Sequence, residues 1–348
     1  MDQKVIFFTS FHPLISRNIL MSNALPMLAK EHGIVVFAPR NKTPYFEEHF
    51  SHEHITIEGI DITLNASDLF FRKLILSITP TKDLFIKKRV EFYKGKQLFS
   101  YLATVLPALL LGRMRWVVRL LRALEYRFAD NARCKEYFDR YRPHLVVSTD
   151  VQNEADLSFL REAKRRGIHT VGMVRSWDNL TSKGILRFVP NRLIVHNEII
   201  KAEAMKYSFV DPNRISVIGL PHYDRYKRAR ESPEYNPASH DYQNARAAFF
   251  ASFHFDSRKK LILFAPFGDR YIRDNQTDLF ILATLSEFDA NILVRLPPTD
   301  AVNFKGFRTN IARVQFYESG QSGGKGGKKL NEISEEDENS LVDSLSFA

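Results

Sequence analysis

The stretch 174–184, VRSWDNLTSKG, brings together side chains that could do chemistry. It sets a cation, several hydroxyls, an indole, a carboxylate, an amide and a lysine directly after the apolar run HTVGMV. A segment that only had to turn the chain would need Gly, Asn or Pro and little else. Open α/β sheets bind ligands at the carboxyl ends of their strands, so this composition predicts a binding site. The alternative is a polar loop in which Trp177 packs on the core and Asp178 caps the next segment.

The residue types in this stretch suit a phosphorylated sugar or polyol. Guanidinium and ammonium groups bind phosphate oxygens, whereas carboxylate and amide groups bind paired hydroxyls. Asp178 is a catalytic candidate, and the candidate substrate-binding residues here are Arg175, Ser176, Trp177, Asn179, Thr181, Ser182 and Lys183.

His12 is the main candidate for a general base. It comes just after the apolar run KVIFFTS, and a histidine can take a proton from a hydroxyl near neutral pH because its ordinary pKa is about 6.5. The alternative is a loop histidine bonded to a neighbouring carbonyl. Asp150, at the end of HLVVSTD, could orient this base or bind a sugar hydroxyl, although an Asp in that place commonly caps the next helix.

Three further residues stand at comparable positions. His196 ends another apolar run, and His222 lies in GLPHYD, where turn chemistry alone explains the Gly and the Pro. Arg295 precedes a Pro-Pro turn and is the one well-placed cation of the C-terminal part. We take the two histidines as candidate substrate contacts and Arg295 as a candidate ligand of donor phosphates.

Motifs for a protein-held metal or a dinucleotide are absent from the sequence. It contains no HExxH, no paired His/Cys spacing and no Asp-x-Asp, and no GxGxxG follows the first apolar run. The run SGGKGGKK misses the GxxxxGK[ST] spacing and leads into acidic residues. We therefore expect no cofactor and no metal, and a nucleotide-activated sugar or CDP-glycerol would enter as a substrate.

The elements that must position these residues follow an α/β pattern. Short apolar, β-rich runs alternate with segments of helical spacing, which is typical of a parallel, doubly wound sheet. In the first part of the chain these runs lie at 4–10, 32–40, 54–62, 144–150, 169–174, 192–197 and 214–219.

A second, smaller α/β unit is predicted after a polar segment with two prolines. Its strand patterns lie at 259–269, 291–300 and 310–319, too few for a complete doubly wound sheet. The expected organisation is a Rossmann-like acceptor-side domain, a linker with a connecting helix, and a partial Rossmann-like donor-side domain that carries a flexible loop. The corresponding boundaries are 1–225, 226–258, 259–348 and 318–339.

The net charge of +10 is concentrated in one helical insertion, 69–141. Residues 72–127 contain thirteen Lys/Arg and only three Asp/Glu. In the segment RWVVRLLRALEYRF, tryptophan and leucines fall on one side of a helix and arginines on the other, so we expect 72–127 to contact an anionic membrane surface. The alternative is a helical pair packed on the sheet with solvated arginines. A nucleic-acid partner is not expected, because it would favour basic residues spread over a broad face.

The composition is ordinary for a globular protein that buries a core. Apolar residues make up 44% of 348, and the single cysteine, Cys134, excludes an internal disulfide framework and suits a reducing compartment. The N-terminus lacks a signal-peptide pattern, and the uncharged run 97–112 is shorter than the roughly 20 residues that a spanning helix requires. We expect a cytoplasmic location, peripheral on the inner face of the membrane.

Taken together, the motifs resemble GT-B-type glycosyltransferases. Within them the chain is most similar to the group around CDP-glycerol glycerophosphotransferases and surface-polysaccharide transferases. The resemblance rests on SWDNLTSKG, GLPHYD, KLILFAPFGD and NILVRLPPTD, and loosely covers 144–300. It implies two Rossmann-like domains across a cleft, with an acceptor-activating base in the first and a nucleotide diphosphate held by the second without a metal. On this resemblance, His12 or Asp178 would serve the acceptor and Arg295 would approach the donor phosphates.

The chain departs from this group at two points. The group often has His-Pro where this chain has Pro297-Pro298, and it continues past LVDSLSFA into a strand–helix segment that binds the donor. The resemblance therefore implies a C-terminally truncated chain with an incomplete second domain.

The expected function is transfer of a glycosyl or glycerophosphoryl group from a nucleotide-activated donor to a cell-surface glycan or a lipid-linked precursor. Two other functions fit the same two-domain plan. One is a nucleotide-sugar 2-epimerase, which would need no acceptor, and the other is a non-catalytic, membrane-associated binding protein.

Overall fold

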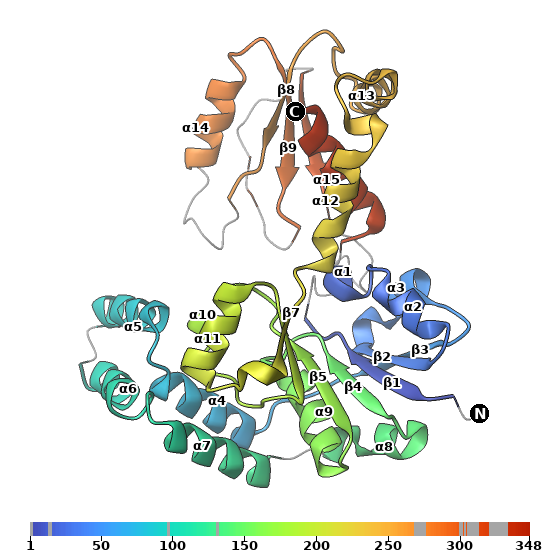
Figure 1. Ribbon diagram of the computed structural model, residues 1–348. Coiled ribbons are helices and arrows are strands. Elements are labelled where there is room, and N and C mark those ends of the chain that lie inside the picture. Colours follow the sequence, from blue (N-terminus) through green and yellow to red (C-terminus); the bar gives the residue numbers. More distant parts are fainter. Residues whose placement is uncertain are drawn as a thin grey trace. The chain divides into compact units, whose positions relative to one another are not determined.

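A computed structural model of the chain describes residues 3–12, 16–95, 98–129, 132–267, 276–298, 302, 304, 313–319 and 333–348. The chain divides into two compact units, Met1–Pro221 and His222–Ala348 (Figure 1). Within each sheet, every strand pair is parallel. The α/β class predicted from the alternating patterns is therefore confirmed.

The first unit is built on a seven-stranded sheet in the order β3-β2-β1-β4-β5-β6-β7. The chain starts at β1, winds outward to β3 and then returns to β4, so the winding direction changes between β1 and β4. Polar side chains that follow these central strands meet at such a switch point. The strands are β1 (Val5–Thr9), β2 (Gly33–Pro39), β3 (Ile55–Ile60), β4 (Leu145–Ser148), β5 (His169–Met173), β6 (Arg192–Val195) and β7 (Ile215–Val217).

The central strands are continuous apolar runs because helices cover both of their faces. Phe7 of β1 pairs with Val35 of β2 and Val146 of β4 and is fully buried. Its ring contacts those of Phe37 and Phe138 edge to face, with centroids 4.8 and 5.2 Å apart. These residues belong to the main core of the unit.

Polar caps begin several helices of this unit. Asn153 accepts a hydrogen bond from Ala155 N at the start of α9, and Asn197 accepts one from Ile200 N at the start of α11. The helices outside the insertion are α1 (Ser16–Ile19), α2 (Ala24–Ala29), η1 (Arg40–Lys42), α3 (Thr43–Phe50), α9 (Glu154–Arg165), α10 (Asn179–Ser182), α11 (Glu198–Ser208) and η2 (Pro212–Arg214). The short helix η3 (Pro221–Tyr223) begins at the last residue of this unit and continues into the second.

Of the helical insertion between β3 and β4, helices α4 to α7 lie together on one side of the unit, and α8 lies apart from them (Figure 1). Val118 packs against Ile75, Ile78 and Ile185 in a small core of its own. Gly112 lies so close to the backbone that a Cβ there would meet Ile78 O at 2.0 Å, which explains the glycine between two helices. The helices are α4 (Ala66–Ile78), α5 (Lys82–Gly95), α6 (Leu98–Leu110), α7 (Arg115–Phe128) and α8 (Ala132–Tyr141).

Within the described ranges, no single helix combines the length and the apolar composition needed to cross a membrane. Helices α6 and α7 meet those criteria only when taken as a pair, and the pair is bent by 115°.

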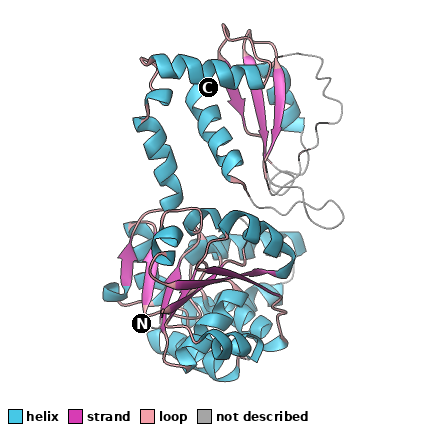
Figure 2. Cartoon of the chain, turned by 90° about the vertical axis from the view of Figure 1, so that its right-hand side faces the viewer, coloured by secondary structure: helices cyan, strands magenta, loops and turns pink. Residues whose placement is uncertain are grey.

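The second unit contains a three-stranded sheet in the order β10-β9-β8, with helices along its strands (Figure 2). Leu293 of β9 packs with α13 and α15, whereas its neighbours Ile292 and Val294 pack with Leu282 of α14. Helices therefore cover both faces of this sheet. Its elements are α12 (Asp224–Glu231), η4 (Pro233–Tyr235), α13 (His240–Ser252), β8 (Leu261–Phe264), α14 (Gln276–Leu285), β9 (Asn291–Leu296), β10 (Val314–Glu318) and α15 (Glu335–Phe347).

Two segments differ from what their polar composition suggested. The segment 226–258, expected as a linker with one helix, contains parts of α12 and all of η4 and α13, and Phe250 of α13 is buried in the core of the second unit. Most of the expected loop 318–339 lies outside the described residues. Its end is helical, because Ser334 and Asp337 form a capping box that begins α15 at Glu335.

Candidate functional site

A cavity of about 370 Å³ lies where β1, β4 and β5 end in the first unit. We call it the carboxyl-edge cavity. His12 reaches it after β1, Asp150 after β4, and Arg175 and Lys183 after β5, as the sequence predicted for the ends of parallel strands. The insertion adds two cations from α4 and α5. The polar residues that line it are His12, Arg72, Lys87, Asp150, Gln152, Asn153, Glu154, Arg175, Ser182, Lys183 and Arg187.

Asp150 and Arg175 form a buried ion pair in this cavity. Arg175 Nη1 lies 3.1 Å from Asp150 Oδ2, and Gln152 N donates to Asp150 Oδ1 at 3.1 Å. Burial raises the pKa of Asp150, while the Arg175 guanidinium opposes this rise. Asp150 does not cap the next helix, because Asn153 takes that role in α9. The pair places a fixed carboxylate and a fixed cation side by side at the strand ends.

His12 is half-buried and lines the same cavity as this ion pair. The structure thus brings the predicted base and the predicted orienting carboxylate to one site. An imidazole there is accessible to a substrate hydroxyl within the cavity, which is the first requirement of a general base.

The rest of the 174–184 stretch divides between the cavity and local structure. Ser182 lines the cavity and donates through Oγ to Asp178 Oδ2 at 2.9 Å, so Asp178 is held by its own turn. Thr181 is bound on both sides: its Oγ1 donates to the Asp178 carbonyl at 3.1 Å, and its own carbonyl accepts from Thr81 Oγ1 at 2.6 Å. The second bond attaches α10 to the insertion.

Trp177 and Asn179 differ in their exposure to solvent: Trp177 is exposed and Asn179 is buried. Ser176, which precedes Trp177, is half-buried. Trp177 is 74% exposed, so the alternative in which it packs on the core is wrong. Asn179 is fully buried, and neither atom of its amide has a hydrogen-bond partner among the described residues. Of the two, Trp177 is the one that a ligand can reach directly.

Asp156 is a buried carboxylate that the sequence did not reveal. Its Oδ1 accepts hydrogen bonds from Thr9 Oγ1 and, at 2.9 Å, from Ser148 Oγ, so it connects the ends of β1 and β4. Burial, together with the nearby charge of Asp150, raises the pKa of Asp156 to about 7. The only sequence signal is an acid in the first turn of α9, where the helix dipole alone favours one.

His196 and His222 do not line the carboxyl-edge cavity. His196 follows β6 and is half-buried; burial lowers its pKa, against the effect of a hydrogen bond with the Val174 backbone. His222 belongs to the second unit, where its Nε2 lies 3.6 Å from Glu338 Oε2. The structure therefore gathers five of the predicted residues, and leaves these two histidines apart from them.

Arg295 is buried between β9 and α15. Its Nη1 donates to Ser340 Oγ at 2.9 Å and to Ser344 Oγ at 3.0 Å, and its Nη2 donates to the Asp337 carbonyl at 3.2 Å. The guanidinium also lies over the ring of Tyr317, 4.2 Å from its centroid. These contacts describe an arginine that attaches α15 to the sheet, and its role as a donor-phosphate ligand stays a prediction.

Helix α7 has three faces with different surroundings. Val117, Val118 and Glu125 are buried against the unit. The apolar stripe of α7, which consists of Trp116, Leu120, Leu124 and Phe128, is exposed, with Trp116 and Phe128 each 64% exposed. On the third face, three arginines line a cavity of about 760 Å³: Arg115, Arg119 and Arg122. Of these three, Arg122 is half-buried and Arg115 and Arg119 are exposed, so the alternative of solvated arginines stays open for the latter two.

No protein-family model matches the chain, and no curated protein matches it. Among solved structures, a glycosyltransferase from Rickettsia africae ESF-5 is similar with a TM-score of 0.49 at 9% identity, over 100% of this chain and 72% of that one. A UDP-N-acetylglucosamine 2-epimerase follows with a TM-score of 0.46 at 12% identity, over 91% and 68%. The wall teichoic acid polymerase TagF has a TM-score of 0.41 at 11% identity, over 90% and 61%.

The chain consists of two parallel α/β units in succession, a large one and a small one, which is consistent with the GT-B-like fold that the sequence predicted. Likenesses at these identities and TM-scores carry no information on activity. The function has to be argued from the site.

Proposed function

We propose that this chain is a metal-independent transferase that moves a glycosyl or glycerophosphoryl group from a nucleotide-activated donor to a hydroxyl of a cell-surface glycan or a lipid-linked precursor. The observation that carries the proposal is the carboxyl-edge cavity, in which a histidine, a buried carboxylate–guanidinium pair and further cations meet at the strand ends. A base beside fixed positive charge is what such a transfer requires.

On the acceptor side, His12 would remove the proton as the acceptor hydroxyl attacks the donor. Asp150 would hold a hydroxyl or orient the base, with Arg175 fixing its position. The exposed indole of Trp177 would stack on a sugar ring, and Asp178 is the second candidate for the base.

On the donor side, cations would neutralise the nucleotide phosphates as the bond to the transferred group breaks. Lys183 and Arg175 are the candidates in the carboxyl-edge cavity. Arg295 would have to exchange its hydrogen bonds with Ser340 and Ser344 for phosphate oxygens before it could join them.

We also propose that the protein binds the inner face of the membrane as a peripheral protein. The exposed side chains of α6 and of the apolar stripe of α7 support this part, among them Phe99, which is 87% exposed. Apolar side chains of this kind insert at the headgroup boundary of a bilayer.

The test is to incubate the protein with a panel of nucleotide sugars and CDP-glycerol, with and without a membrane extract as acceptor, and to follow nucleotide release by mass spectrometry. We expect release that depends on the acceptor, and a rate about 10²- to 10⁴-fold lower for His12→Ala, the loss typical of a general base. His169→Ala is the matched control, because this exposed histidine stands at the opposite end of β5.

Each other result has a distinct meaning. Conversion of a nucleotide sugar without acceptor would favour the 2-epimerase, and ligand affinity without turnover would favour a binding protein. No release from any donor, or equal rates for His12→Ala and the parent, would contradict the proposed transfer.

A further inference from the structure

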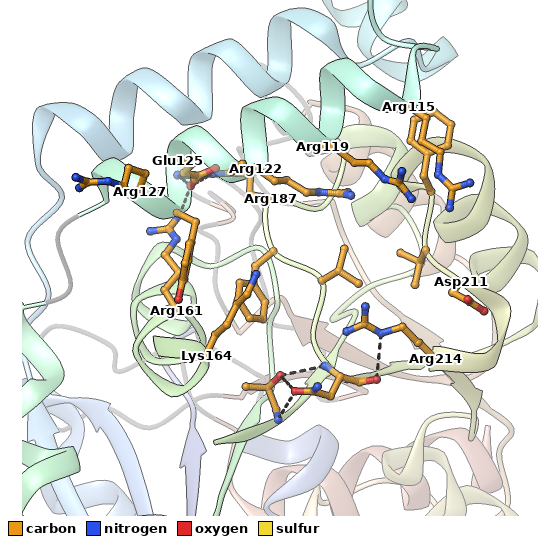
Figure 3. A pocket seen from close by; sticks show the side chains of 18 residues that line it. Arg115, Arg119, Arg122, Glu125, Arg127, Arg161, Lys164, Arg187, Asp211 and Arg214 are labelled. Carbon is orange, nitrogen blue, oxygen red and sulfur yellow. Dashed lines mark hydrogen bonds and ion pairs between the residues drawn. The ribbon is translucent and has the colours of Figure 1, made fainter. Parts of the chain in front are cut away.

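A cavity of about 760 Å³ lies in the first unit at the edge of the sheet opposite the carboxyl-edge cavity. It is enclosed by α7, by the end of α9 and by residues near the starts of β5, β6 and β7, so we call it the amino-edge cavity (Figure 3). Seven arginines and one lysine line it, against two acids, Glu125 and Asp211. Positive charge from α7 and from neighbouring elements is thus gathered around one hollow.

Acids neutralise only part of this charge, since the described ion pairs with Glu125, Asp68 and Glu154 involve, among the cavity cations, Arg161 and Arg187 alone. Glu125 is 1% exposed and is already shared by Arg161 and Arg187, whose Nε donates to Glu125 Oε1 at 2.8 Å. Asp211 caps the short helix η2 by accepting from Asn213 N at 2.9 Å. Among the residues that the structure describes, it forms no ion pair with a cavity arginine.

Carbonyl groups hold two of the guanidinium groups in place without compensating their charge. Arg122 donates from Nε to the Leu186 carbonyl at 2.7 Å and from Nη2 to the Ser208 carbonyl at 2.8 Å. Arg214 donates from Nη2 to the Pro190 carbonyl at 2.6 Å. Groups held in this way are oriented before a ligand arrives, which lowers the entropic cost of binding.

Other cations of the cavity have no acidic partner in the described part of the chain, among them Arg115, Arg119 and Lys164. Figure 3 shows Arg119, Lys164 and Arg214 bordering the same space from α7, α9 and the segment before β7. Burial lowers the pKa of Arg122 to about 10, and the neighbouring charge of Arg119 adds to this effect. An anion bound in the cavity would offset the electrostatic repulsion between the guanidinium groups of Arg119 and Arg122.

We infer that the amino-edge cavity is a second binding site, which takes a phosphate- or diphosphate-bearing molecule. Arginine forks match the oxygens of phosphate in geometry as well as charge, and oriented guanidinium groups from several elements can surround such a group. The volume is in the range of small-molecule sites. Arg187 is the only residue that lines both cavities, so the two sites are separate within the described residues.

The phosphate can come from a soluble molecule or from a lipid headgroup. The apolar stripe of α7 is exposed on the same helix whose Arg115 and Arg119 line the cavity. A helix with its stripe in a bilayer would carry these arginines at the depth of the headgroups. The chemistry of recognition is the same in both cases, so the experiment needs one arm for each source.

The experiment compares two double variants of equal charge at fixed ionic strength. Arg119→Gln/Lys164→Gln removes two cavity cations that have no acidic partner in the described part of the chain, and both side chains are exposed enough to be replaced without unfolding. Lys227→Gln/Arg228→Gln removes two exposed cations of α12, which lie outside the basic segment 72–127 and do not line this cavity. Circular dichroism melting confirms that each variant is folded.

One arm titrates inorganic pyrophosphate by calorimetry, and the other sediments the protein with vesicles that contain phosphatidic acid. We expect the cavity variant to weaken binding at least tenfold in one arm or both, and the α12 variant to change it less than twofold. If the cavity variant binds pyrophosphate more weakly than the parent does, the ligand is a soluble molecule. If the variant loses affinity only for the vesicles, the ligand is a lipid headgroup. Equal weakening by both variants, or no binding in either arm, would overturn the inference. Neither arm requires turnover, so failure of the proposed transferase activity leaves this test intact.

Discussion

Asp156 is the residue whose ionisation should most affect the fold. It is fully buried below the ends of β1 and β4, and its hydrogen bonds from Thr9 and Ser148 both go to Oδ1. Because its pKa of about 7 in the folded chain exceeds the roughly 3.9 of an unfolded Asp, folding favours the protonated form. The contribution of the protonated Asp156 carboxyl to the free energy of unfolding is fully present below about pH 4 and is lost as the pH rises through 7.

Asp156→Asn should remove this loss, because an amide has the shape of the protonated carboxyl and its oxygen can still accept from Thr9 and Ser148. The unfolding free energy of Asp156→Asn minus that of the parent should increase by on the order of 4 kcal/mol from pH 4 to pH 8, which follows from the shift in the pKa of Asp156. Urea unfolding at several pH values measures this difference.

Asp139→Asn serves as the control for that measurement. Asp139 is exposed, and its hydrogen bond with Arg166 lowers its pKa, so any effect of its replacement belongs to lower pH. Its difference from the parent should stay flat between pH 5 and pH 8. A similarly flat difference for Asp156→Asn would mean that the Asp156 carboxyl is ionised throughout this range.

At the scale of residues, sequence reasoning located side chains that follow strands and missed partners that are distant in the chain. His12, Asp150 and Arg175 were predictable because apolar runs mark the strands and parallel strands end at one edge. Asp156 was not, since nothing local shows that Thr9, 147 residues earlier, donates to it. The surroundings of Arg295 were hidden for the same reason, because Ser340 and Ser344 come much later in α15.

At the scale of elements, periodicity identified the faces of α7 but could not assign their surroundings. Arginines and apolar side chains do lie on different sides of this helix. The pattern cannot show that a cationic cavity against the sheet receives Arg119 and Arg122, nor that Trp116 is left exposed. An amphipathic pattern gives the angle between two faces, and tertiary packing decides which of them meets solvent.

The orientation of α7 predicts how the protein should bind vesicles. Trp116→Ser should reduce partitioning into anionic vesicles about tenfold or more, because burying a large apolar side chain in an interface contributes roughly 1.5–3 kcal/mol. Its 64% exposure means that folding should be unaffected. Flotation of labelled protein with vesicles measures the partition coefficient.

Met27→Ser is the matched control for Trp116→Ser. Met27 of α2 is 66% exposed and lies outside the helical insertion, so its loss should leave partitioning within twofold of the parent. Salt should release only part of the bound protein, since apolar contact is not screened by ions. Complete release by salt, with no effect of Trp116→Ser, would mean that the contact is purely electrostatic and would contradict insertion of the apolar stripe.

At the scale of the whole molecule, both cavities belong to the first unit. Their described lining residues all lie within Met1–Pro221, and the core of this unit is formed by its own strands and helices. The fold class followed from the order of the strand patterns, whereas the amino-edge cavity did not. Its cations come from α7, from α9 and from the residues before β7, and no spacing in the sequence connects these segments.

A fragment of residues 1–221 should therefore fold alone and keep the binding properties of the first unit. We expect cooperative unfolding of the fragment, and affinity for pyrophosphate within twofold of the whole chain, because no described lining residue of the amino-edge cavity is removed. Affinity for nucleotide donors should fall at least tenfold if residues 222–348 hold the donor, which is the role that the resemblance to GT-B-type glycosyltransferases implies for the second unit. Circular dichroism and calorimetry on the two proteins, side by side, measure all three quantities. A fragment that folds and binds donors as tightly as the whole chain would place donor recognition in the first unit and would contradict the donor-side role proposed for the second.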